Sequence, residues 1–177
     1  MYNLSNVGKD FPWTKVVYNE VEPWREKETE EDAWFSDLPK GWGDITYDYL
    51  KKMNKVLKEY DLTDYLVIEQ VKEKWGTGRF YYSFWDVKGN WRHWSDEQKD
   101  GIKKFDIYAS AWETAVGKVC CMCGTTEDVQ MFGGWVHYAC PTCEQKRIIK
   151  QRNEYREWLA SKEGQKYLDD LANFGKE

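Results

Sequence analysis

The sequence lacks the segments that would mark a membrane protein or a secreted precursor. Its longest apolar runs are short, as in residues 65–68, whereas a membrane-spanning helix needs about 20 consecutive apolar residues. The first residues contain neither the basic segment nor the apolar core of a signal peptide. The apolar share of 41% and the charged share of 32% also exclude a disordered chain. We therefore expect a globular cytoplasmic protein that has no membrane partner.

Residues that catalysis usually requires are also scarce. The chain has two histidines, His93 and His137, and contains no nucleophile elbow, phosphate-binding loop or His-Glu-x-x-His motif. Glu69, Glu73 and Asp86 could gather on one hairpin, but exposed strand charges explain them more simply. We therefore expect a protein that is not an enzyme.

An excess of positive charge, the usual mark of a nucleic-acid-binding protein, is absent as well. The net charge is −5. Seven acidic and two basic residues lie between Glu20 and Asp32, so this stretch alone carries −5 and the rest is close to neutral. Such a run is most simply a solvated surface. The overall charge therefore gives no bias toward nucleic acid.

What the sequence has in excess is aromatic side chains, with 11 tryptophans and 12 tyrosines. Aromatic rings fill cores and also form rigid contact surfaces, and a core role is the simpler interpretation. Residues 1–40 hold Trp13, Trp24 and Trp34 among charges and three prolines, which predicts an irregular arm. The three tryptophans are candidate anchors for a protein partner. The alternative, which we favour for Trp24 and Trp34, is that the arm docks on its own domain.

Two amphipathic helices are predicted in the segment that follows. Apolar residues recur at helical spacing from Asp44, which can cap, to Tyr60. The second helix begins at Ser95, because Ser95 and Gln98 have the spacing of a capping box. Its apolar stripe ends at Gly117, just before the first cysteine pair.

Between these helices the pattern indicates a β-hairpin. Residues 65–74 alternate and are rich in β-branched and aromatic side chains, and residues 79–85 return after a glycine-containing turn. Residues 91–94 are a candidate third strand.

The strongest chemical signal is a pair of Cys-x-x-Cys motifs, Cys120/Cys123 and Cys140/Cys143, separated by sixteen residues. This spacing is typical of a zinc site, in which four thiolates surround one ion tetrahedrally. The intervening residues can form a small hairpin that brings the two pairs together. Since four thiolates fill the coordination sphere, we expect one structural Zn²⁺ rather than a catalytic one.

Two further residues, Cys121 and His137, lie beside the predicted ligands in the sequence. Cys121 is a spare thiol or an exchange partner for Cys120 as a ligand. His137 has poor spacing for a ligand, and we expect it to pack or donate a hydrogen bond near the site.

After the second pair, residues 146–177 are predicted to form helices, the second of which restarts at Ser161. A basic patch with interleaved aromatic residues lies in the first of them and is a candidate nucleic-acid contact: Lys146, Arg147, Lys150, Arg152 and Arg156. Glutamates dilute this patch, so a solvated helix face is the simpler interpretation.

Part of the chain is similar to a known family. Residues 67–82, with the sequence VIEQVKEKWGTGRFYY, resemble the Q-V-K-E-K-F-G-x-L-R-F-Y segment of small uncharacterised proteins found in bacteria and in phage genomes. Trp42 with the following helix and the surroundings of the cysteines are also similar, so the resemblance covers about residues 41–147. The chain departs from the family at Trp75, where phenylalanine is usual, and at Gly78, where leucine is usual.

The resemblance implies a zinc-ribbon domain in a phage or prophage setting, where small accessory proteins often bind and inhibit host machinery. The expected function is therefore that of a non-catalytic zinc-binding protein, phage-encoded, that inhibits a host or defence-system protein. The alternative is a nucleic-acid-binding accessory protein that uses the basic helix.

The combined patterns predict an α+β fold, in which helices pack on a small antiparallel hairpin or sheet. A treble-clef or zinc-ribbon-like module with four cysteines and C-terminal helices follow. The predicted organisation is an acidic, tryptophan-rich arm at 1–40, an α+β core at 41–117, a zinc ribbon at 118–145 and C-terminal helices at 146–177.

Overall fold

The computed structural model describes residues 1–16, 33–85, 93–134 and 136–174. The chain divides into two compact units, Met1–Cys140 and Pro141–Glu177. The first contains the helices and strands η1 (Leu4–Asn6), α1 (Val7–Asp10), η2 (Pro12–Thr14), η3 (Lys40–Trp42), α2 (Gly43–Glu59), η4 (Thr63–Tyr65), β1 (Leu66–Lys74), β2 (Thr77–Phe84), α3 (Asp96–Val116), β3 (Gln130–Phe132) and β4 (His137–Ala139). The second contains α4 (Pro141–Ala160) and α5 (Lys162–Asn173). The predicted α+β class is confirmed.

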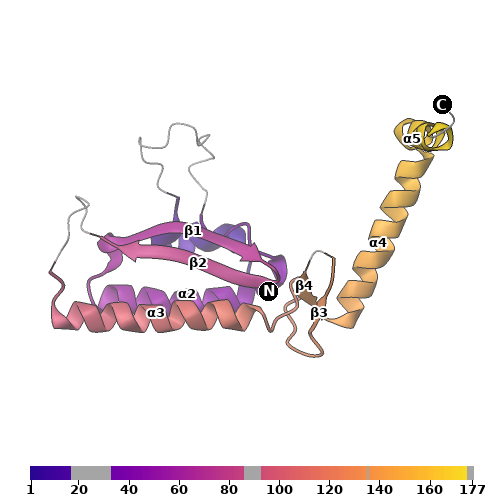
Figure 1. Ribbon diagram of the computed structural model, residues 1–177. Coiled ribbons are helices and arrows are strands. Elements are labelled where there is room, and N and C mark those ends of the chain that lie inside the picture. Colours follow the sequence, from indigo (N-terminus) through magenta and orange to yellow (C-terminus); the bar gives the residue numbers. More distant parts are fainter. Residues whose placement is uncertain (17–32, 86–92, 135, 175–177) are drawn as a thin grey trace. The chain divides into compact units, whose positions relative to one another are not determined.

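The first unit is a two-layer structure. Figure 1 shows α2 and α3 side by side along one face of the antiparallel β1–β2 hairpin, and both α2 and β2 contact α3. The helices are two of those that the apolar spacing predicts. The start of α3 has the predicted capping box: the Gln98 amide donates to the Ser95 hydroxyl at 3.1 Å, and the Gln98 side chain accepts from the Ser95 amide.

The core between the two layers combines aliphatic side chains with several large aromatic ones. Trp42 and Trp112 are fully buried, together with Phe35 and Phe105. The rings of Phe35 and Trp112 meet edge to face, with centroids 5.5 Å apart. The Trp112 indole donates to the Thr46 hydroxyl at 3.1 Å, which satisfies a buried polar group.

The N-terminal segment differs from the expected irregular arm. Its described residues form short helices, and Leu4, Val7 and Phe11 are buried in the same core as α2 and α3. A backbone bridge between Lys15 and Ala33 leads the chain back to the buried Phe35. Hydrophobic burial explains this arrangement, because each short helix supplies one or two large apolar groups to the core.

The β1–β2 hairpin is held on α3 by side chains from that helix. Glu113 accepts a hydrogen bond from the Phe80 amide at 2.7 Å, and Asp106 accepts one from the Tyr82 hydroxyl at 2.6 Å. Burial, together with the bond to Asp106, raises the pKa of Tyr82 well above its ordinary value. Residues 91–94, the candidate third strand, lie partly outside the described residues, and His93 and Trp94 are not in a strand.

The second unit is a pair of helices in contact with each other. Ser161 separates them as predicted and caps α5, since its hydroxyl accepts from the Gly164 amide at 3.1 Å. A ring contact between Trp158 and Tyr167, with centroids 5.4 Å apart, joins α4 to α5. Among the described residues, no helix is both long enough and apolar enough to cross a membrane.

Candidate metal centre

The first Cys-x-x-Cys pair lies in a tight turn after α3. The Gly124 amide donates to the Cys120 carbonyl at 3.0 Å, and the Cys120 amide donates to the Thr125 carbonyl at 2.9 Å. Gly124 has φ = +79°, a left-handed conformation that glycine adopts without steric cost. The tight turn can form because the residue that follows Cys123 is a glycine, which adopts the left-handed conformation that the turn requires.

The second pair is delivered by the predicted small hairpin. Strands β3 and β4 pair antiparallel, with Gln130 opposite Ala139, and β4 leads directly into Cys140. Cys143 follows in the first turn of α4. The first pair is linked to β4 through the backbone, because the Cys121 amide donates to the Tyr138 carbonyl at 2.9 Å.

The four cysteines that the spacing predicts come together in the structure. The sulfur atoms of Cys120, Cys123, Cys140 and Cys143 all lie within 4.8 Å of one another. Those of Cys123 and Cys140 are 3.8 Å apart. Two of the four residues, Cys120 and Cys140, are buried. A group of this geometry can hold a metal ion.

The electrostatics of the site favour the thiolate that a metal needs. Burial by itself disfavours ionisation of Cys120, but the backbone N–H groups of Cys123, Cys140 and Met122 point at its sulfur. Together with the Cys123 side chain they lower the pKa of Cys120 to about 6, from an ordinary value near 9. The thiolate is the form of cysteine that ligates metals.

The turn that holds the first pair packs closely on the start of α2. The Gly41 amide donates to the Cys121 carbonyl at 2.8 Å. A Cβ atom on Gly41 would lie 2.1 Å from the Cys120 carbonyl oxygen, and one on Gly124 would lie 2.8 Å from the Gly41 carbonyl oxygen. Two glycines thus let the cysteine turn and the core approach to backbone contact. The spacing of the cysteines gives no sign of this contact, and the role of Gly41 in packing the cysteine turn was not predicted from the sequence.

Cys121 and His137 lie near the cysteine group but outside it. Cys121 is half-buried and contributes its backbone to both contacts described above. His137 stacks on Phe132, with ring centroids 5.8 Å apart, so the expectation that it packs is confirmed.

The basic patch on α4 is partly neutralised within its own helix. Arg147 forms two hydrogen bonds, of 2.8 and 2.6 Å, with the buried carboxylate of Glu144. Lys150 lies 3.6 Å from Glu154. The other three cations, Lys146, Arg152 and Arg156, are exposed. The sequence therefore overstates the charge that this patch offers to a phosphate backbone.

Two of the three tryptophans that are candidate anchors for a partner lie in the described part of the chain. Trp13 is half-buried, donates to Asn54 at 3.2 Å and packs edge to face on Phe105. Trp34 is also half-buried against the core, and Trp24 lies outside the described residues. Trp13 and Trp34 therefore dock on the chain's own core.

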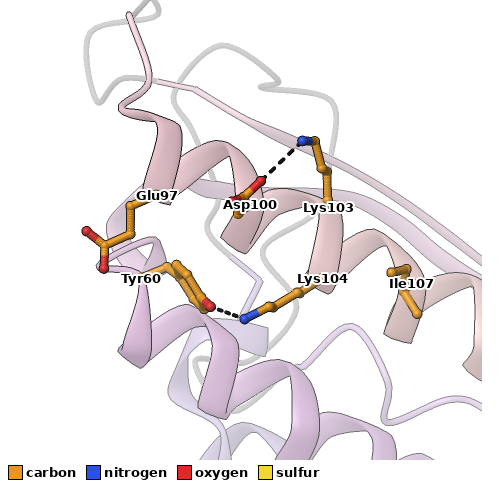
Figure 2. A pocket seen from close by; sticks show the side chains of 6 residues that line it. All are labelled: Tyr60, Glu97, Asp100, Lys103, Lys104 and Ile107. Atoms are coloured by element: carbon orange, nitrogen blue, oxygen red, sulfur yellow. Dashed lines mark hydrogen bonds and ion pairs between the residues drawn. The ribbon is translucent and has the colours of Figure 1, made fainter.

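A shallow pocket of about 470 Å³ opens at the N-terminal half of α3 and is lined by Tyr60, Glu97, Asp100, Lys103, Lys104 and Ile107 (Figure 2). The Lys104 ammonium donates to the Tyr60 hydroxyl, and this bond raises the pKa of Lys104. Asp100 pairs with Lys103 at 3.2 Å. The bond holds Lys104 in its charged form, in which an amine is a poor nucleophile.

Comparison of the chain with protein-family models, with curated proteins and with solved structures finds no match.

Proposed function

We propose that the chain is a non-catalytic zinc protein that acts by binding another protein, with α5 as the principal contact. Zinc is the proposed metal because all four ligands are soft sulfur atoms in a compact group. Four protein ligands leave no position for water or substrate. The ion would therefore stabilise the fold around the cysteine turn, rather than catalyse a reaction.

The observation that supports protein binding is a row of exposed apolar side chains on α5. Tyr167, Leu168 and Leu171 are 41–52% exposed, and Phe174, just after the helix, is 90% exposed. Their spacing places them on one face. The ring stack of Tyr155 on Trp158, with centroids 5.9 Å apart, continues this apolar surface onto α4. Contiguous exposed apolar surface of this kind marks interaction sites.

The free energy available from this face is large enough to matter. Full burial of one leucine or phenylalanine side chain contributes about 1.5–3 kcal/mol. Covering the exposed parts of the four α5 side chains would contribute on the order of 5 kcal/mol, before the costs of association.

The charge on α5 favours a protein over other partners. Its polar positions carry three carboxylates, of Glu163, Asp169 and Asp170, against Lys162 and Lys166. The resulting net charge of −1 gives α5 no electrostatic attraction to the phosphates of nucleic acids or to anionic lipid headgroups. An apolar protein groove is the partner that this combination fits.

In the pocket beside Tyr60, Lys104 is held in its charged form and is a poor nucleophile, which supports a role without nucleophilic catalysis by this lysine. Residues 67–82 resemble a segment of small proteins found in bacteria and in phage genomes. This resemblance supports the proposal that the partner is a host protein and that binding inhibits it. Nucleic acid bound by the basic helix has less support, because Arg147 and Lys150 are already paired with carboxylates.

The test is site-specific photo-crosslinking in bacterial cells. A photoreactive side chain at Leu171 should give one discrete protein adduct, whereas the same group at Asp169, which the helical spacing places opposite this face of α5, should give none. The captured protein, purified, should bind the wild-type chain and lose about tenfold or more in affinity for Leu171→Asp. Equal adducts from both positions, or unchanged affinity for Leu171→Asp, would contradict the proposal. A dimer of the chain seen by light scattering, lost in Leu171→Asp, would also contradict it, because the occupant would then be a second copy.

A further inference from the structure

The β1–β2 hairpin has one face toward the core and an opposite, outer face. Packing in the core does not explain the residue types on this outer face. Val71 is paired with Phe80, and both side chains belong to the core. The neighbouring pairs in the ladder are Lys72 with Arg79 and Gln70 with Tyr81. Because side chains alternate along a strand, these pairs project to the face opposite the core. Figure 1 shows α2 and α3 together along one face of the hairpin.

This outer face combines exposed aromatic rings with cations. Tyr81 is 46% exposed, and the Lys72 ammonium lies 5.6 Å from the centre of its ring. At the hairpin tip Trp75 is 67% exposed, with the Lys74 ammonium 4.6 Å from its ring. Trp85, at the other end of the face, is 42% exposed. Each of the first two rings therefore has a positive charge beside it and a surface open to a planar group.

The cations of this face are available to a phosphate. Within the described part of the chain, none of Lys72, Lys74 and Arg79 lies within ion-pair distance of a carboxylate. The Lys72 ammonium donates to the neutral Gln70 side chain, and Arg79 donates to the Gly78 carbonyl at 2.7 Å. These partners leave the positive charges uncompensated, in contrast to Arg147 and Lys150 on α4.

The backbone conformation at the hairpin tip is a second, independent indication that this face is a functional site. Trp75 and Gly76 form the two-residue turn between β1 and β2, with φ angles of +53° and +77°. Both central residues of such a turn need positive φ, which favours asparagine, aspartate or glycine over a bulky aromatic residue. The chain therefore holds a mostly exposed tryptophan in a strained conformation, and strain of this kind concentrates at functional sites.

The hairpin tip also packs against β4, the strand that leads into Cys140. A Cβ atom on Gly76 would lie 2.5 Å from the Tyr138 ring and 3.2 Å from the His137 Cα atom, so β4 packs directly against the turn. The Glu73 side chain accepts from the Gly76 amide. These contacts fix the direction of the turn that carries Trp75.

We infer that the outer face of the β1–β2 hairpin is a binding site for single-stranded nucleic acid. Tyr81 and Trp75 stack on unpaired bases, and Lys72, Lys74 and Arg79 neutralise the phosphates between them. Exposed rings interleaved with cations are the arrangement that single strands require, since every base offers a face for stacking. In a duplex the bases are already stacked and are not free to occupy the rings.

The test measures binding of the zinc-loaded full chain to a labelled single-stranded oligonucleotide of about 16 nucleotides, as DNA and as RNA, by fluorescence anisotropy. Tyr81→Ala should weaken binding about 5- to 150-fold. Trp75→Asn should weaken it similarly while its melting temperature stays equal or rises, because asparagine suits the turn. A loss of affinity that only followed unfolding could not produce this combination.

Salt dependence separates the phosphate contacts from other charges. For three contacts the slope of log K against log salt should be about −2, and Lys72→Ala/Arg79→Ala should reduce it to about −0.7. The matched control is Lys55→Ala/Lys58→Ala, which removes two exposed lysines of α2 and should change nothing.

Three results would overturn the assignment. The first is undetectable binding at low salt. The second is equal or tighter binding of a duplex with the same sequence. The third is binding that survives the hairpin substitutions but is lost in Arg152→Ala/Arg156→Ala, which would move the contact to α4.

Discussion

Replacing Gly41 by alanine tests whether the cysteine turn is built onto the core at backbone distance. The added methyl group would lie 2.1 Å from the Cys120 carbonyl oxygen and 2.6 Å from the Cys121 carbonyl carbon. Both are backbone atoms, so no side-chain rotation relieves the overlap. The turn must move away, and the hydrogen bond from the Gly41 amide to the Cys121 carbonyl is then lost.

The expected cost follows from two contributions. Overpacking of a tight contact costs about 1–3 kcal/mol, and loss of one hydrogen bond costs about 1 kcal/mol. We expect a total of about 2–4 kcal/mol, which corresponds to a fall in melting temperature of roughly 5–15 °C for a chain of this size. Because Cys120 moves with the turn, a chelator should also extract the metal faster from Gly41→Ala than from the wild type.

The matched control is Gly133→Ala in the loop between β3 and β4. Among the described residues other than its two chain neighbours, none has a heavy atom within 4 Å of a Cβ atom on Gly133, so its substitution should change the free energy of unfolding by no more than about 0.5 kcal/mol. Thermal melting by circular dichroism compares the two variants. Equal melting temperatures of the Gly41→Ala and Gly133→Ala chains would refute the close packing of Gly41 on the backbone of Cys120 and Cys121.

Three further substitutions probe the core and its helices. Trp112→Phe removes the donor to the buried Thr46 hydroxyl and leaves a cavity, so chemical denaturation should show a loss of about 2–3 kcal/mol; a loss below about 1 kcal/mol would contradict the packing. Ser95→Ala should cost about 1 kcal/mol through loss of the α3 cap, and an unchanged denaturation midpoint would show that the cap contributes nothing. Tyr82 has a raised pKa when folded, so the unfolded state loses its proton first and stability falls as the pH rises above about 10, by up to about 1.4 kcal/mol per pH unit. Tyr82→Phe should therefore show a shallower alkaline loss of stability than the wild type, and identical slopes would mean that the bond to Asp106 does not persist in solution.

The regular elements were predictable because their signals are local. The capping residues Ser95 and Gln98 mark the start of α3 in the sequence, and the structure forms that cap. Periodic apolar residues gave α2 to within one residue of Gly43–Glu59. The cysteine group was predictable for a different reason, since its spacing alone matches the requirement of a metal for four ligands.

The remainder depends on contacts between residues distant in sequence. Prolines and charges in residues 1–40 indicate irregular backbone, but the burial of Leu4, Val7 and Phe11 is decided by the space that α2 and α3 leave open. The role of Gly41 cannot be read locally either, because its neighbour is the Cys120 carbonyl about 80 residues away. Likewise, a run of basic residues does not show which of its charges are neutralised. The ion pair between Glu144 and Arg147 forms only when the helix brings the two side chains together.

The proposed zinc centre is tested most directly by elemental analysis of the purified chain and of two cysteine variants. We expect one zinc per chain in the wild type and in Cys121→Ser, because Cys121 lies outside the group of four sulfur atoms. Cys123→Ser should lose the metal and melt at a lower temperature. Full zinc content and unchanged stability in Cys123→Ser, or a wild-type chain that contains no zinc, would contradict the account.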